Sequence, residues 1–303
     1  MLTPGTLCDL ASTLVLTATL LALGAAVIHA GWNLAIKTSG DRWLALWGQM
    51  TAAGIVGLPL VVISTFPGTF FGSNDDLLGG RLTMSTWGWA ALSGLIHAVY
   101  IFRLARTYDV ADFSVTYPIA RGGGALVAAI GGVVLLNDDL PWISALGILI
   151  VVLGLTFIAG HVDLAHVRAA LVVAVFIGAY TVVDSKGARS TDSIVYAWSI
   201  FVPTAIGVTL DGVARGRWAE MKASVKSSWI QYTITGIASA VTYWMVLAAV
   251  KRAPVGYVTA LRESSVVLAA FIGWRYLREK SGRRRIIASK IVLAGLVTLV
   301  AGR

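Results

Sequence analysis

The feature that most constrains this chain is a series of ten apolar segments, joined by mostly short connections. Each has roughly 17 to 25 residues and, at about 1.5 Å per residue in an α-helix, can cross a hydrocarbon core ~30 Å thick. Hydrophobic residues make up 57% of the chain and charged residues 13%, and the mean hydropathy of +0.80 is outside the range of soluble domains. Backbone polar groups in lipid need internal partners, so the sequence predicts an all-α membrane protein. We place the ten helices at 14–37, 42–66, 87–107, 113–136, 141–159, 168–188, 194–214, 229–249, 255–277 and 284–301.

One part of the chain occurs twice. Residues 87–139 return as residues 229–280, with one position skipped midway. The third and fourth segments match the eighth and ninth, so equivalent segments are an odd number of crossings apart and run in opposite directions. The pattern predicts two inverted five-helix repeats, 1–160 and 161–303, with a binding site near the midplane between them. The corresponding pairs are Gly94 and Gly236, Ala98 and Ala240, Arg121 and Arg262, Gly132 and Gly273, Leu136 and Leu277, and Asp138 and Glu279.

Charge in the connections indicates the orientation and the partners. Loop Lys and Arg divide six against fourteen, which predicts that the side holding both termini is outside the cytoplasm. The net charge of +9 is interpreted as this topology signal together with attraction to anionic lipid, and not as a nucleic-acid surface. Residues 215–228 are predicted to be a connection, either a solvated loop or an amphipathic turn at the lipid surface. Cys8 is the only cysteine, which excludes an intramolecular disulfide and a Cys-based metal site, and we expect no cofactor and no metal.

Three charged residues fall deep inside predicted helices. Arg121, Arg262 and Glu263 each carry an insertion penalty of roughly 2.5 to 3.5 kcal/mol, so they are expected to face the protein interior. Arg121 precedes Gly122–Gly124, and the glycines allow either a close backbone approach or a local helix break. The Arg121 guanidinium then either binds a substrate carboxylate or phosphonate bidentately, or ties down backbone carbonyls or an acid in a neighbouring helix.

Glu263 is interpreted either as a structural ion-pair partner or as a proton carrier. Consecutive helical residues point about 100° apart, so Arg262 and Glu263 pair poorly with each other and need partners elsewhere. The candidate partners are Asp184 and His97, and Asp184 is a second candidate for proton coupling.

Histidine and aromatic residues in the same helices are candidates to line a substrate cavity. His29, Trp32 and Asn33 share one helical face, where packing is the alternative, and His97 lies near the centre of the third segment. The aromatic candidates are Tyr100, Tyr117, Tyr180, Tyr243 and Trp244. Two glycine pairs spaced by seven residues, Gly147 with Gly154 and Gly295 with Gly302, predict close helix packing in a scaffold or a dimer contact.

Three segments resemble a known family. They are IHAGWNLAIK at 28–37, YPIARGGGALVAAIGGVVLLND at 117–138 and ALRESSVVLAAFIGWRYLRE at 260–279, and they are similar to the drug/metabolite transporter superfamily, in particular its ten-helix EamA-type members. The resemblance implies a multi-pass carrier of the bacterial inner membrane, with a central cavity lined mainly by the first, third, fourth, sixth, eighth and ninth helices. Members usually end the repeat with Gly-Glu, whereas Asn137-Asp138 and Arg278-Glu279 stand here. Many members also keep both termini cytoplasmic, against the charge count, so sidedness stays open.

The sequence thus favours a secondary transporter over other classes of membrane protein. We expect alternating access for a small polar metabolite, anionic or zwitterionic (amino-acid-like, or a phosphonate or carboxylate), by a monomer or homodimer with flexible points near Gly122–Gly124 and Gly131–Gly132. The alternative is a multidrug or organic-cation exporter, proton-coupled through Glu263. An intramembrane enzyme is less favoured, since no Gly-x-Ser-x-Gly or His-Glu-x-x-His motif occurs. A lipid flippase would leave the paired deep charges unexplained.

Overall fold

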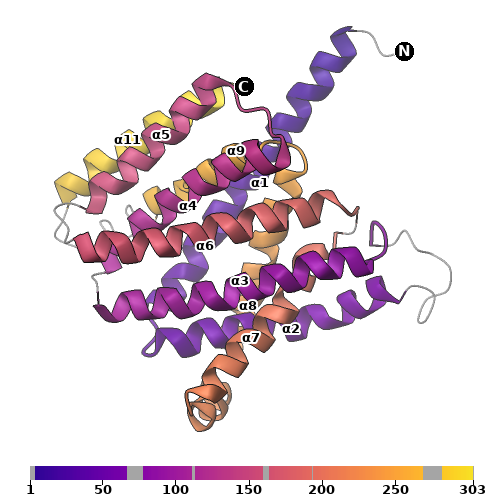
Figure 1. The fold of residues 1–303 in the computed structure, drawn as a ribbon, viewed down its shortest axis with the longest axis vertical. Coiled ribbons are helices and arrows are strands. Elements are labelled where there is room, and N and C mark those ends of the chain that lie inside the picture. The colour runs from indigo at the N-terminus through magenta and orange to yellow at the C-terminus, as the bar shows by residue number, and fades with distance from the viewer. Residues whose placement is uncertain are drawn as a thin grey trace. The chain divides into compact units, whose positions relative to one another are not determined.

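A computed structural model describes residues 4–66, 78–110, 113–159, 164–192, 194–268 and 282–302, and in these ranges the chain is helical with short connections and contains no strand (Figure 1). Among the described residues, six helices are long and apolar enough to cross a membrane, and α5 and α11 each include a shorter apolar stretch. The chain is therefore an all-α membrane protein, as the apolar segments predicted. The helices are α1 (Pro4–Lys37), α2 (Arg42–Thr65), α3 (Met84–Val110), α4 (Phe113–Leu136), α5 (Trp142–Ala159), α6 (Leu164–Arg189), α7 (Tyr196–Ala214), α8 (Trp218–Val250), α9 (Val255–Arg262) and α11 (Gly282–Ala301).

The predicted helix boundaries agree closely with the structure, with two clear exceptions at helix starts. α1 begins at Pro4 instead of residue 14, and α8 begins at Trp218 instead of residue 229. Of the two alternatives for 215–228, the solvated loop is wrong from residue 218 onward, because the amphipathic pattern is helical and forms the first turns of α8. Met221 in these turns is fully buried in a cluster with Trp43, Trp47 and Tyr232. This apolar contact explains why the helix extends beyond the segment that hydropathy alone identified.

The chain forms two compact units. The first unit combines Met1–Val27, Ala111–Val182 and Met245–Arg303, and the second combines Ile28–Val110 and Val183–Trp244. In the first unit α5 packs on α11, and α4 packs on α5 and α9; in the second, α7 packs on α2 and α3. Each unit takes helices from both predicted repeats, so packing and sequence duplication divide the chain in different ways.

Glycines set the helix contacts of the first unit. A Cβ atom at Gly147 would lie 2.4 Å from the backbone nitrogen of Leu299, and one at Gly295 would lie 2.7 Å from that of Val151. The backbones of α5 and α11 thus approach at a distance that only glycine permits. Of the two uses predicted for these glycines, the structure shows the scaffold contact within the chain.

The glycine run after Arg121 serves close packing as well. α4 continues as one helix from Phe113 to Leu136, without a break at Gly122–Gly124. A Cβ at Gly123 would lie 2.8 Å from the Cβ of Ala174, and one at Gly124 would lie 2.4 Å from Cγ2 of Ile177. The glycines therefore let α6 lie directly against α4, and the alternative of a helix break at this point is wrong.

The core of the second unit is aromatic. Trp43, Trp47, Ile101, Val208, Met221 and Tyr232 pack together. Trp47 Nε1 donates to Thr209 Oγ1 at 2.9 Å, which links α2 to α7, and Gln49 Nε2 donates to the Thr235 carbonyl at 3.2 Å, which links α2 to α8. Side-chain hydrogen bonds between helices thus join a core that is otherwise apolar.

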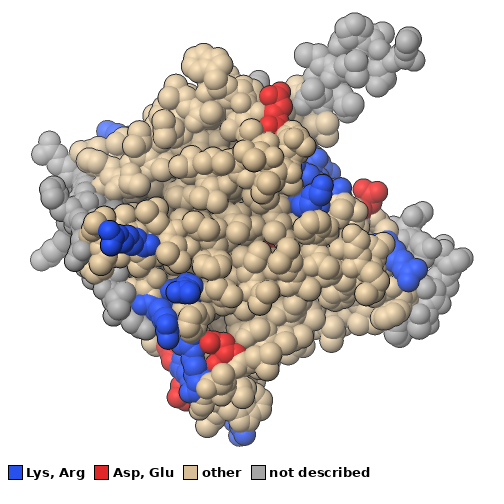
Figure 2. Space-filling model, in the orientation of Figure 1, with Lys and Arg blue, Asp and Glu red and all other residues tan. Residues whose placement is uncertain are grey.

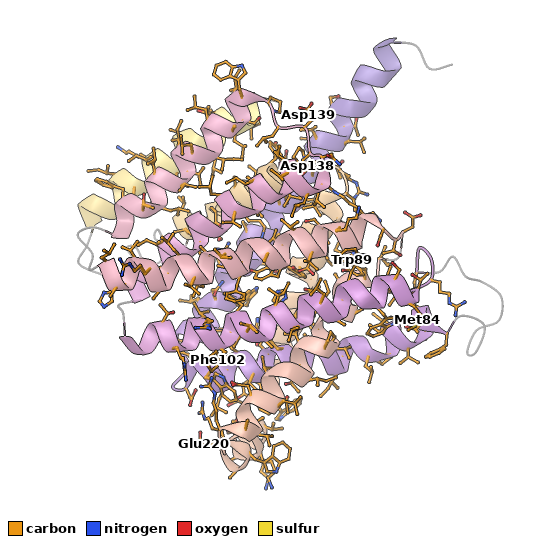
Figure 3. The ribbon with its side chains drawn as sticks, viewed as in Figure 1. Met84, Trp89, Phe102, Asp138, Asp139 and Glu220 are labelled. Carbon is orange, nitrogen blue, oxygen red and sulfur yellow. The ribbon has the colours of Figure 1, made fainter. Side chains whose placement is uncertain are left out.

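On the face shown in Figure 2, charged residues gather at few places on a largely uncharged surface. In the second unit Arg217 forms ion pairs with Asp41 and Glu220, and its guanidinium lies 4.5 Å from the Trp43 ring centre. Partial burial lowers the pKa of Arg217, but the bonds to Glu220 and Asp41 raise it more, so the pKa lies above its ordinary value. Arg217 therefore keeps its charge at every physiological pH. These contacts hold the start of α8 against the start of α2, and Glu220 is labelled in Figure 3.

Candidate functional site

The first unit contains a buried ion pair between two helical segments that are far apart in the sequence. Arg121 lies on α4, and Glu263 directly follows α9. Arg121 Nη2 lies 2.7 Å from Glu263 Oε1, and Arg121 Nε donates to Oε2 at 3.2 Å. The two side chains are only 9% and 4% exposed. The guanidinium thus binds the carboxylate in a bidentate arrangement with two parallel bonds, which is the strongest geometry for this pair.

This contact identifies a protein partner for Arg121 and for Glu263. Arg121 binds an acid from a neighbouring helix, which is one of the predicted arrangements. Asp184 and His97 were the candidate partners for Arg262 and Glu263 together. For Glu263 they are wrong, because Arg121 binds both of its carboxylate oxygens. For Arg262 they stay a prediction. Arg262 is 7% exposed and lies in the last turn of α9.

The helical path is interrupted at Glu263. α9 ends at Arg262, Glu263 forms a turn, and residues 264–268 are helical again. The Glu263 amide donates to the Ala260 carbonyl and the Val266 amide donates to the Glu263 carbonyl, each at 3.0 Å. Both bonds span three residues instead of four, so the chain is tightened at the ion pair. The expectation of one continuous helix over 255–277 is therefore wrong at this residue, and residues 269–281 lie outside the described part.

The residues Asn137-Asp138, which depart from the family's usual Gly-Glu, position α4 and α9 relative to each other. Asn137 has a φ of 55°, a left-handed conformation that ends α4 and that asparagine adopts more easily than most residues. The Asp138 amide then donates to the Gly132 carbonyl at 3.0 Å, and the Asp138 carboxylate accepts from the Val255 amide at 2.6 Å. Asp138, labelled in Figure 3, thereby caps the start of α9. Sequence reasoning missed this role, although an acidic residue directly after a helix end was a visible signal.

The second unit brings together another group of predicted residues around Asp184. This carboxylate on α6 is completely buried and accepts a hydrogen bond from the Tyr243 hydroxyl of α8. The Ser93 hydroxyl of α3 lies beside the same carboxyl and 3.1 Å from His97 Nδ1. The His97 ring makes edge contacts with the rings of Tyr243 and Tyr100, at centroid distances of 6.0 and 6.5 Å.

Ser93 was not among the predicted site residues. It precedes His97 by four positions and so lies one helical turn away on the same face, a spacing from which its contact with His97 follows. A small hydroxyl residue in an apolar helix is a weak signal by itself, because serine also serves in packing.

The other predicted residues occupy separate places. The rings of His29 and Trp32 meet edge to face at 4.5 Å, and Asn33 Nδ2 donates to the His29 carbonyl at 3.0 Å, so the shared face exists. Tyr180 is buried on α6 in the first unit, and Trp244 is half-buried on α8 in the second. The side chain of Tyr117 lies outside the described residues. Their predicted role in lining a cavity stays a prediction.

Metal-binding side chains do not cluster in the ranges that the structure describes. There, no group of three or more His, Cys, Asp and Glu side chains is arranged to hold a metal ion.

Comparison with known proteins adds the family. Residues 166–301 match the EamA-like transporter family. This part of the chain is similar to that family. EamA-like proteins are members of the drug/metabolite transporter superfamily, and they are transporters and not enzymes. The EamA-like region extends from α6 to α11 and so includes Asp184, Tyr243, Arg262 and Glu263.

Solved structures agree with the fold. One of 29 matching chains is titled "Crystal structure of protein". The match covers 93% of this chain and 96% of that chain, with a TM-score of 0.71 and 18% sequence identity. At this identity the likeness shows the fold alone. A search of curated proteins gave no match.

Proposed function

We propose that this EamA-like protein is a secondary active transporter that moves a small anionic or zwitterionic metabolite by alternating access. The single observation that carries the proposal is the buried, bidentate Arg121–Glu263 ion pair at the turn that follows α9. In membrane proteins, charged groups at depth and interrupted helices are typical of substrate sites.

The proposal includes ten helices in two inverted repeats, 1–160 and 161–303. The helix contacts support this arrangement, because α2 packs on α7, α4 on α9 and α5 on α11. Each pair joins a helix of the first repeat to the helix at the same position in the second repeat. Such contacts are expected around a two-fold axis that relates the repeats. The Arg121–Glu263 pair then joins equivalent helices of the two repeats.

The substrate class follows from the geometry of the guanidinium. Arg121 already holds a carboxylate with its Nε and Nη2 donors, and a substrate carboxylate or phosphonate presents the same pair of acceptor oxygens. We propose that the substrate replaces Glu263 on Arg121 during transport. The tightened turn at Glu263 provides a point at which that side chain can move away while α9 stays anchored by its Asp138 cap.

A second candidate function rests on the acid of the same pair. Once separated from Arg121, Glu263 would be a buried carboxylate able to bind an organic cation or a proton in turn. This is the arrangement of a proton-coupled multidrug exporter. Transport of an anionic or zwitterionic metabolite across the bacterial inner membrane remains the preferred proposal. A monomer is preferred over a homodimer, since the glycine faces of α5 and α11 are occupied within the chain.

Uptake into proteoliposomes tests the proposal. The purified protein is screened with radiolabelled amino acids, dicarboxylates, phosphonates and organic cations, in the native form and as Arg121→Gln. We expect transport of at least one anionic or zwitterionic compound, and at least a tenfold loss in Arg121→Gln. Arg252→Gln is the matched control, because Arg252 is exposed and follows α8, and it should transport at the native rate.

Two results would contradict the proposal. Transport of organic cations that survives Arg121→Gln but is lost in Glu263→Gln would favour the multidrug exporter. Absence of transport for every compound in vesicles that contain folded protein would remove the substrate classes named here.

A further inference from the structure

We infer that Asp184, with Ser93, His97 and Tyr243, forms a proton-binding site that is distinct from the Arg121–Glu263 pair. The inference rests on the proposed transport function and deepens it by naming the group that carries the coupling proton. The site lies wholly within the second unit.

The surroundings of Asp184 leave its negative charge without a counter-charge. Its side chain is completely buried, and no ion pair to it occurs in the part of the chain that the structure describes. Oδ2 accepts the Tyr243 hydroxyl, whereas Oδ1 is buried with no hydrogen-bond partner. A buried carboxylate in this state is costly when ionised, and a proton bound to the carboxyl group removes the charge.

Three helices place polar groups near Asp184, and these groups are neutral or able to carry a proton. α3 contributes Ser93 and His97, and α8 contributes Tyr243. α7 contributes Tyr196, which interacts electrostatically with Asp184. The Tyr196 hydroxyl is also buried without a hydrogen-bond partner. No lysine or arginine is among these groups, so the site is suited to holding a proton and unsuited to holding an anion.

The contacts also provide a path for the proton. His97 is partly exposed, and its Nδ1 lies 3.1 Å from Ser93 Oγ. A hydroxyl both donates and accepts, so Ser93 Oγ can take the Nδ1 proton of a protonated His97 as its own proton passes to Asp184. The transfer leaves a neutral His97, an unchanged Ser93 and a neutral Asp184, with no other reactant needed.

Glu263 has the opposite surroundings. Both of its carboxylate oxygens face the Arg121 guanidinium, which provides the counter-charge that Asp184 lacks. Two buried carboxylates in one chain thus have different tasks: Glu263 neutralises the anion-binding arginine, and Asp184 takes and releases the proton. We therefore assign coupling to Asp184 in preference to Glu263.

Infrared spectroscopy of the purified protein in lipid tests this assignment without a known substrate. A protonated carboxyl group has a carbonyl stretch that the ionised form lacks, and hydrogen bonding shifts its frequency. The protein is titrated from about pH 5 to about pH 9. We expect one carbonyl band of a protonated carboxyl group that disappears as the pH rises. The band should be absent in Asp184→Asn, shifted in Tyr243→Phe and unchanged in Glu263→Gln, the matched buried carboxylate.

Each outcome bears on the inference. A band that survives Asp184→Asn, or that is lost in Glu263→Gln instead, would overturn it. Tyr243→Phe keeps the Asp184 carboxyl in place, so its frequency shift remains informative if Asp184→Asn fails to fold. The transport screen separates the two proposals. An Asp184 band that titrates in a protein without transport activity would refute the proposed function and support the proton site. Transport activity without that band would support the proposed function and refute the proton site.

Discussion

Removing one partner of the buried ion pair should destabilise the protein far more than removing both. In Arg121→Gln the Glu263 carboxylate, 4% exposed, would remain in the interior without its guanidinium. Breaking a buried pair in this way typically costs about 3 to 5 kcal/mol. At ~1.4 kcal/mol for each factor of ten, the unfolding equilibrium constant would rise by roughly 10² to 10⁴. The double variant Arg121→Gln/Glu263→Gln leaves no charge behind, and we expect it to lie within about 1 to 2 kcal/mol of the native protein.

The assay is reversible unfolding by SDS in mixed micelles, followed by the fluorescence of the 11 tryptophans. The native protein, both single variants and the double variant form a double-mutant cycle, which isolates the energy of the pair from other effects of each substitution. Arg252→Gln again serves as the exposed control and should change stability by less than about 0.5 kcal/mol.

The outcome that would refute this reasoning is an additive cycle. If Arg121→Gln costs less than about 1 kcal/mol, or if the double variant is as unstable as the sum of the single ones, the two charges are not mutually dependent. The bidentate contact could not then be the arrangement that holds α4 to the turn after α9.

Three further predictions concern packing, capping and surface charge. Gly147→Val should lower the thermal midpoint by several degrees because its side chain would meet the backbone of α11, whereas Gly88→Ala, with no atom near the added Cβ, should leave it unchanged or slightly raised; differential scanning fluorimetry measures both. Asp138→Ala removes the carboxylate that accepts the first amide of α9 and should cost about 1 kcal/mol in the SDS assay, while Asp138→Asn should retain part of the cap. Arg217→Gln should cost no more than about 1 kcal/mol despite two ion pairs, since these are solvent-exposed, and the loss should shrink further in high salt; an effect as large as that of Arg121→Gln would show that exposure does not weaken them.

Hydropathy and segment length fixed most helix positions in advance, because a lipid interior permits few alternatives to the helix. α4 begins and ends at the predicted residues, and α2 ends one residue early. The starts of α1 and α8 were missed because helix extensions outside the apolar segment depend on other contacts; for α8 these are the burial of Met221 and the ion pairs of Arg217.

The candidate site was predictable as a set of residues and not as a set of contacts. Charges at membrane depth identified Arg121, Arg262 and Glu263, because each must be compensated inside the protein, and Asp184 was named as a candidate partner. Their partners were not predictable, since Arg121 and Glu263 are 142 positions apart and the pairing depends on how α4 meets α9.

The sequence by itself thus determined the class of protein, the helices and the residues that cannot face lipid, because these follow from the local balance between polar groups and hydrocarbon. Only the tertiary structure decided that Glu263 is neutralised by Arg121, that Asp184 accepts a bond from a tyrosine and meets no cation among the described residues, and that the glycines of α4, α5 and α11 serve close packing. Those outcomes depend on distances between helices, and such distances are set jointly by side chains from segments far apart in the chain.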